Sequence, residues 1–91
     1  MIRLNIFMTV GERHRAEIRM IADQLIEASL KDAGCKGYDF FQSITRPEVM
    51  MICETWESEE ALKAHQETPH FKRLVPLLHT LCETKSEIYA K

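Results

Sequence analysis

The stretch Val49–Trp56 constrains the fold of this chain more than any other, because it is apolar on both sides of a strand. With the period of two of a β-strand, one face holds Met50, Ile52, Glu54 and Trp56, and the other holds Val49, Met51, Cys53 and Thr55. Such a strand has to be covered on both sides. A sheet built around it therefore needs helices over one face and a second layer over the other.

The rest of the chain supplies three more strands and the helices. Residues 2–10 are apolar at every second position, which predicts a strand. Apolar spacings of three and four predict a helix over 12–33 that ends at Gly34. A second strand is expected over 37–45, before the turn at 46–48, and a last strand over 85–90.

The second helical region is predicted to be split in two. Ser58 is a good N-cap for a short helix to about Gln66, and Thr68 followed by Pro69 begins another helix. Pro76 is expected to kink or end this last helix near 74–75.

The order of elements is β-α-β-β-α-β, which predicts an α+β fold of the ferredoxin-like split βαβ type. Its four-stranded antiparallel sheet would carry helices on one face only. Ninety-one residues are enough for a single domain over 1–91 and leave no further element to cover the other face. The simplest cover is a second copy of the chain, so we expect a homodimer packed sheet against sheet.

Composition excludes several classes of partner. Twelve Lys and Arg against fourteen Asp and Glu give a net charge of -2, which removes the usual reason to expect nucleic acid or an anionic membrane. No apolar run approaches the ~20 residues of a membrane span, and the N-terminus does not resemble a signal peptide. We therefore expect a cytoplasmic protein. Cys35, Cys53 and Cys82 are widely spaced, as structural thiols would be.

The sequence lacks the common catalytic and metal-binding motifs. The chain has no phosphate-binding loop, dinucleotide-binding glycine motif or nucleophile elbow. His65 and His70 are five residues apart with Pro69 between them, which is not the spacing of helical zinc sites. A metal held by His65, His70 and a carboxylate such as Glu54 is the less favoured interpretation, and we expect no metal.

Residues 54–71 nevertheless contain a recognisable sequence motif. It runs from Glu54 and Trp56 through His65 to Thr68-Pro69-His70-Phe71, and resembles the antibiotic biosynthesis monooxygenase (ABM) domain family, in particular its small bacterial quinol-monooxygenase-like members. The segment 33–38 is similar to the same branch. The resemblance implies a dimeric α/β barrel with a pocket between sheet and helices. It also implies oxidation of a quinol or phenol by O2 without a metal, flavin or other cofactor.

Such chemistry needs a base near neutral pKa, hydrogen-bond donors for an oxyanion and a dry pocket. His65 is the best candidate base, since it lies on the apolar side of a short helix. Asn5 is a candidate to hydrogen-bond a substrate oxygen, and His70 a second acid, base or orienting group. The candidate pocket residues are Trp56, Phe71, Phe40 and Glu54.

Each candidate also has a structural interpretation. Trp56 suits a core position, His70 can bond the backbone at a helix start, and Glu54 can pair with a Lys or Arg of a helix. Asn5 can simply hydrogen-bond at a strand edge, and His65 can be a satisfied buried histidine.

Three other functions remain open within the resemblance. Haem degradation is disfavoured, because haem-degrading relatives have tryptophan in place of His65 and a histidine ligand in place of Val75. An isomerase of a small hydroxycarbonyl metabolite, like those that process autoinducer-2, would use the same histidine without O2. The third is a dimeric module that binds a small ligand and catalyses nothing.

Overall fold

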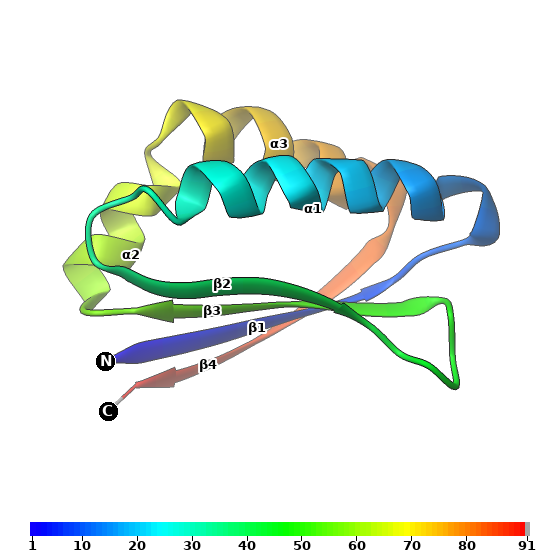
Figure 1. Cartoon of the computed structure of the whole chain (residues 1–91), viewed down its shortest axis with the longest axis horizontal. Helices are drawn as coiled ribbons and strands as arrows, with labels where there is room; N and C mark the ends of the chain where they lie inside the picture. Colours follow the sequence, from blue (N-terminus) through cyan, green and yellow to red (C-terminus); the bar gives the residue numbers. More distant parts are fainter. Residues whose placement is uncertain (91) are drawn as a thin grey trace.

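Four strands form one antiparallel sheet, and the helices lie together on one of its faces (Figure 1). The computed structural model describes residues 1–90; Lys91, the last residue of the predicted domain, lies outside them. The strands are β1 (Ile2–Thr9), β2 (Cys35–Gln42), β3 (Val49–Trp56) and β4 (Glu83–Ala90). The helices are the short η1 (Glu12–His14), then α1 (Arg15–Ser29), α2 (Glu59–Gln66) and α3 (Pro69–Leu81).

The sheet order is β2-β3-β1-β4, with each pair of neighbours antiparallel. This order and the single helical layer confirm the predicted ferredoxin-like fold. Within residues 1–90, no helix is both long and apolar enough to cross a membrane.

The core lies between the helices and the even-numbered side chains of β1 and β3. Ile6 pairs with Ile52, and Ile52 with Phe40 of β2, so three apolar side chains form one row under the helices. The buried positions of α1 are those that the helical spacing predicts, namely Ile18, Ile21, Ala22, Leu25 and Ser29. The amphipathic patterns of helix and strand therefore meet at one buried layer.

The split of the second helical region is confirmed, but the alternative that Pro76 ends the last helix is wrong. The Ser58 hydroxyl accepts a hydrogen bond from the Ala61 N–H at 3.1 Å and caps α2. The helix α3 does not end near 74–75 and runs on to Leu81, with Pro76 inside it. Proline removes one helical hydrogen bond, and the buried Leu74 and Leu78 on either side hold both parts of α3 against the core.

The turn between α1 and β2 depends on glycine. Gly34 has φ 79°, a left-handed conformation that other residues rarely adopt. A Cβ at this position would approach the Ala61 Cβ to 2.5 Å, so the turn lies directly against α2. The Gly34 carbonyl also accepts a hydrogen bond from the Glu57 N–H at 2.7 Å. Glycine here lets the end of α1 reach the helix that carries His65.

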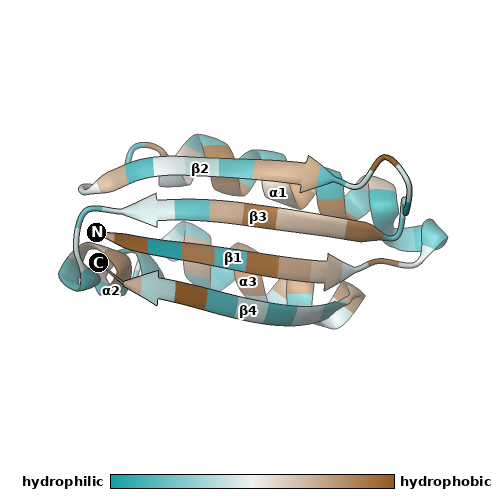
Figure 2. Ribbon diagram, turned by 90° about the horizontal axis from the view of Figure 1, so that it is seen from below, coloured by the Kyte–Doolittle hydropathy of each residue, from teal (hydrophilic) through white to brown (hydrophobic). Residues whose placement is uncertain are grey.

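No element of residues 1–90 covers the other face of the sheet (Figure 2). The register places Phe7, Met51 and Phe41 in one row across β1, β3 and β2 on this open face. Phe41 is 51% exposed, and the other two are half-buried. The doubly apolar strand is thus covered by helices on one side only.

Candidate active site

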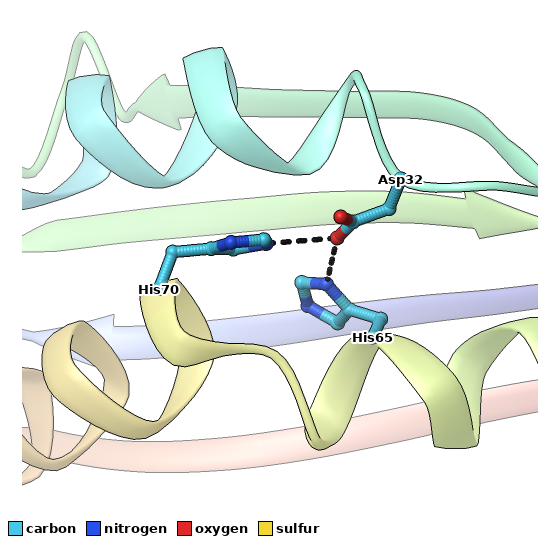
Figure 3. A group of neighbouring side chains, drawn as sticks. All are labelled: Asp32, His65 and His70. Atoms are coloured by element: carbon cyan, nitrogen blue, oxygen red, sulfur yellow. Dashed lines mark hydrogen bonds and ion pairs between the residues drawn. The ribbon is translucent and has the colours of Figure 1, made fainter.

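Three polar side chains from separate parts of the chain meet between the end of α1 and the helices α2 and α3 (Figure 3). The Asp32 Oδ2 lies 2.8 Å from the Nδ1 of His65 and 2.8 Å from the Nε2 of His70. An ionised carboxylate can only accept hydrogen bonds, so both imidazole nitrogens act as donors. Asp32 thus links α2 to the first turn of α3.

Local sequence places each member of this group. Asp32 follows α1 in the turn that Gly34 closes, and His65 occupies the last turn of α2. Thr68 donates its hydroxyl proton to the His65 carbonyl at 2.6 Å and also caps α3 by accepting from the Phe71 N–H at 3.3 Å. His70 follows Pro69 directly, so the short link between the two helices holds both imidazoles beside one carboxylate.

His65 is almost fully buried among aromatic rings. Its ring centroid lies 4.4 Å from that of Trp56, 5.2 Å from that of Phe71 and 5.8 Å from that of Tyr38. Burial lowers the pKa of His65 below its ordinary value, although the neighbouring Asp32 acts in the opposite direction. A neutral imidazole that donates from Nδ1 carries a lone pair on Nε2. That Nε2 is buried and has no hydrogen-bond partner among the described residues.

Glu54 is the group that the His65 lone pair faces. The Glu54 Oε1 lies 3.9 Å from the His65 Nε2 and accepts a hydrogen bond from the Trp56 Nε1 at 2.9 Å. Glu54 is 2% exposed, and this burial raises its pKa to about 7, against the lowering effect of hydrogen bonds from Trp56 and Tyr38. Glu54 can therefore take up or release a proton near neutral pH.

A cavity of about 150 Å³ lies between the sheet and the helices and reaches Glu54. Tyr38 and Phe71 stand beside Glu54 in its wall, and burial next to Glu54 raises the pKa of the Tyr38 hydroxyl. Most of the remaining wall is apolar, with Leu4, Ile6, Ile52, Leu62, Val75 and Leu78, and the polar residues are Gln66, His79, Thr84 and Ser86. One end of an apolar chamber thus carries an acid–base group and a phenolic donor.

The structure brings together most of the side chains that the sequence nominates. Glu54 and Phe71 line the cavity, while Trp56 supports Glu54 from within the core. His65 lies behind Glu54 and is not in the cavity wall, and His70 faces Asp32 rather than backbone.

Two nominated residues lie elsewhere. Asn5 pairs with Cys53 on the open face of the sheet, because alternate residues of β1 point in opposite directions. Asn5 is thus separated by the sheet from His65. Phe40 does face the helices, opposite Ile52, but does not line the cavity.

Sequence reasoning missed Asp32 and Tyr38. Asp32 is 33 positions from His65 in the chain, and no spacing rule connects an acidic residue in a turn with a helix that follows two strands. Tyr38 had a usable signal, since it shares a strand face with Phe40 and alternates with polar Asp39. Its pairing with Glu54 follows only from the register of β2 against β3.

The group Asp32, His65 and His70 also has the residue types of a metal site. One ligand atom of each lies within 4.8 Å of the others, and two imidazoles with a carboxylate are a known donor set for divalent metals. However, both short N···O distances are those of hydrogen bonds, which need a proton on each nitrogen. A divalent metal ion at this position would displace both protons and take their place between the same three ligand atoms.

Comparison with known proteins places the chain in a family. The family model described as antibiotic biosynthesis monooxygenase matches residues 1–77. The chain belongs to the ABM family. Among curated ABM relatives, YcnE of Bacillus subtilis (strain 168) is 32% identical over 75 residues, which are 82% of this chain and 79% of YcnE.

A second ABM relative carries a more specific name. "Probable quinol monooxygenase YgiN" of Escherichia coli (strain K12) is 35% identical over 71 residues, covering 68% of this chain and 67% of YgiN. Among solved structures, a conserved protein from Bacteroides thetaiotaomicron VPI-5482 is 45% identical, with a TM-score of 0.94 over 97% of this chain and 94% of that one. The ABM fold of the present chain is therefore shared along nearly its whole length.

Proposed function

We propose that this protein is a cofactor-independent monooxygenase that oxidises a small, single-ring quinol or phenol with O2. The observation that carries the proposal is the buried pair of Glu54 and His65 at the end of an apolar cavity. The name of the relative YgiN supports the quinol class. The membership of the ABM family supports the reaction type.

The chemistry requires an anion in a dry site. O2 has a triplet ground state and reacts slowly with closed-shell molecules, whereas an electron-rich phenolate can pass it one electron. Glu54 takes the substrate proton at the cavity wall, and the His65 Nε2 behind it shares that proton. Tyr38 keeps its own proton, because burial raises its pKa. Once Glu54 has taken up the substrate proton, the Tyr38 hydroxyl can turn from Glu54 and donate to the developing oxyanion.

The reaction balances without a further reductant. A hydroquinone and one O2 give a hydroxyquinone and one water, so one oxygen atom enters the ring and the other leaves as water. The substrate supplies all the electrons that reduce O2. The stored proton is returned to the oxygen atom that departs. The protein's part is to accept, hold and return this proton while it excludes water.

The cavity volume restricts the substrate. An apolar cavity of about 150 Å³ is roughly the size that holds one benzene ring. One hydroxyl of a hydroquinone can meet Glu54 while the ring lies against Phe71 and the aliphatic wall. A fused two-ring quinol would fill this volume and extend toward the exposed side chains of His79 and Ser86 at the cavity wall.

Oxygen consumption tests the proposal. The protein is incubated with one-ring and two-ring hydroquinones in an oxygen electrode, and the product is analysed for incorporated ¹⁸O from ¹⁸O2. We expect turnover with one-ring substrates and a loss of about 10²–10⁴-fold in His65→Gln. Equal rates in the two proteins would remove His65 from the mechanism, and absence of label would exclude a monooxygenase.

An isomerase of a small hydroxycarbonyl metabolite is the second candidate. The favouring observation is that Glu54 and His65 form a complete acid–base pair that needs no O2. An anaerobic assay separates the two functions, because only isomerisation persists without O2. A ligand-induced thermal shift without turnover under either condition would instead indicate a non-enzymatic binding module.

We also propose the sheet-to-sheet homodimer that the sequence predicts. The open face carries the row of Phe7, Met51 and Phe41, and a second copy would remove it from water.

A substitution that places a charge on the open face of the sheet tests the dimer. Met51→Glu is expected to convert the dimer into monomer in light scattering, because an unpaired carboxylate between two sheets is costly to bury. The control is Met20→Glu on the exposed side of α1, where the side chain is 64% exposed. A wild-type monomer at micromolar concentration would contradict the proposal.

A further inference from the structure

We propose that Asp32 is a positioning residue that fixes the tautomer of His65, and that His70 holds Asp32 in place for this task. The inference deepens the proposed function, on which its catalytic consequence rests. It concerns side chains on the far side of His65 from the cavity, since neither Asp32 nor His70 lines the cavity wall.

The first step is the direction of the hydrogen bonds. The Asp32 Oδ2 accepts from the His65 Nδ1 at 2.8 Å, so the proton of the neutral imidazole resides on Nδ1. In the opposite tautomer, a carboxylate oxygen and a nitrogen lone pair would face each other at this distance and repel. Asp32 therefore selects the form in which the His65 Nε2 carries its lone pair toward Glu54.

The second step is the role of this lone pair. The His65 Nε2 is buried, has no hydrogen-bond partner among the described residues, and lies 3.9 Å from the Glu54 Oε1. This separation is too long for a hydrogen bond at rest, but acid–base contacts of this kind often tighten when substrate binds. A proton that reaches Glu54 can then move on to the imidazole. The Asp32 carboxylate stabilises the imidazolium that forms.

The third step concerns how Asp32 is held. Its side chain lies in a turn and is 15% exposed, so water competes for it. His70, whose side chain is 16% exposed, donates a second hydrogen bond to the same oxygen from the first turn of α3. Pro69 and the Thr68 cap fix the start of that helix. Two N–H donors at 2.8 Å thus orient one acceptor oxygen toward His65.

The titratable groups around His65 come from four elements or their connections. Glu54 is on β3, Tyr38 and Cys35 are on β2, Asp32 is in the turn that leads into β2, and His70 is on α3. Of these, only Glu54 and Tyr38 reach the cavity. A measurement of which His65 nitrogen carries the proton therefore separates the effect of Asp32 from titration of the other groups.

The test compares Asp32→Asn with wild type by ¹⁵N NMR of histidine-labelled protein at pH 8, without substrate. In wild type we expect His65 to be protonated at Nδ1 and bare at Nε2. Asparagine is neutral, so in Asp32→Asn we expect a mixture with the Nε2–H form. The control is Asp23→Asn on the exposed side of α1, which should keep the wild-type spectrum.

With a hydroquinone substrate, Asp32→Asn is expected to lower kcat by up to about 10⁴-fold with little change in KM, as loss of an aspartate that fixes a histidine tautomer does. An unchanged Nδ1–H tautomer in Asp32→Asn would overturn the inference whatever the activity. Metal bound at these three residues in the purified protein, with both N–H signals absent, would also overturn it. If wild type oxidises no quinol but the tautomer changes as expected, the proposed reaction fails and the positioning role stands.

If Asp32→Asn does not fold, His70→Asn gives the second measurement. Removing the second donor is expected to speed solvent exchange of the His65 Nδ1 proton, because Asp32 is then free to turn toward water. An exchange rate equal to that of wild type would contradict the role assigned to His70.

Discussion

Glu54→Gln is expected to lower kcat/KM for a one-ring hydroquinone by about 10²–10⁴-fold. Glutamine has nearly the same shape and its carbonyl oxygen can still accept the Trp56 N–H, but it cannot take up a proton. The measurement is initial O2 uptake at several substrate concentrations. Glu60→Gln, at an exposed position in the first turn of α2, is the matched control and should retain wild-type activity.

The pH profile gives the same prediction a second readout. Because burial raises the pKa of Glu54 to about 7, wild-type kcat/KM should rise as pH increases through this value and the carboxylate forms. Glu54→Gln should lose this rise. A variant that keeps both the wild-type rate and the wild-type pH profile would show that Glu54 is not the base.

The second large effect is on stability, where Glu54→Gln should change the pH dependence of unfolding. Glu54 binds its proton more tightly in the folded chain, where its pKa is about 7, than in the unfolded chain, where its pKa has the ordinary value of 4.5. The folded state therefore holds more protons between these values, and wild-type stability falls as pH rises from about 4.5 to 7. The shift corresponds to about 3 kcal/mol.

This loss of stability is absent in Glu54→Gln. The free energy of unfolding of the variant, relative to that of wild type, should therefore increase by up to about 3 kcal/mol from pH 5 to pH 8. Urea unfolding at the two pH values measures it. His65 acts in the opposite direction, because its lowered pKa makes stability rise with pH up to its ordinary value of 6.5. The difference between the two proteins isolates Glu54. Parallel pH profiles would contradict the raised pKa.

The two predictions also test each other. A buried carboxyl group whose ionisation costs stability is a candidate functional group. A variant that is more stable than wild type at pH 8 and is inactive would show that Glu54 serves activity at a cost in stability. A variant that is stabilised but fully active would show that the reaction does not need Glu54.

The sequence by itself determined the architecture of the protein. The alternation in 2–10 and 49–56 and the spacing of Ile18, Ile21 and Leu25 are local patterns. Burial of an apolar face is the largest driving force available to such elements, so the patterns lead to one sheet with helices on one side. The prediction that the last helix could end near Pro76 was wrong for a related reason, since packing of Leu74 and Leu78 outweighs the missing hydrogen bond of one proline.

The tertiary structure alone decided how the candidate site is assembled. Glu54, His65 and Phe71 belong to a readable string, but their roles depend on which of them reaches the cavity and which lies behind. Asp32 contacts His65 across 33 positions of the chain because of the turn at Gly34. Asn5 is excluded from the candidate site because it lies on the opposite face of the sheet. Hydrogen bonds and pKa values arise from distances between elements. Periodicity in one element cannot specify those distances, because they are set by how all the elements pack.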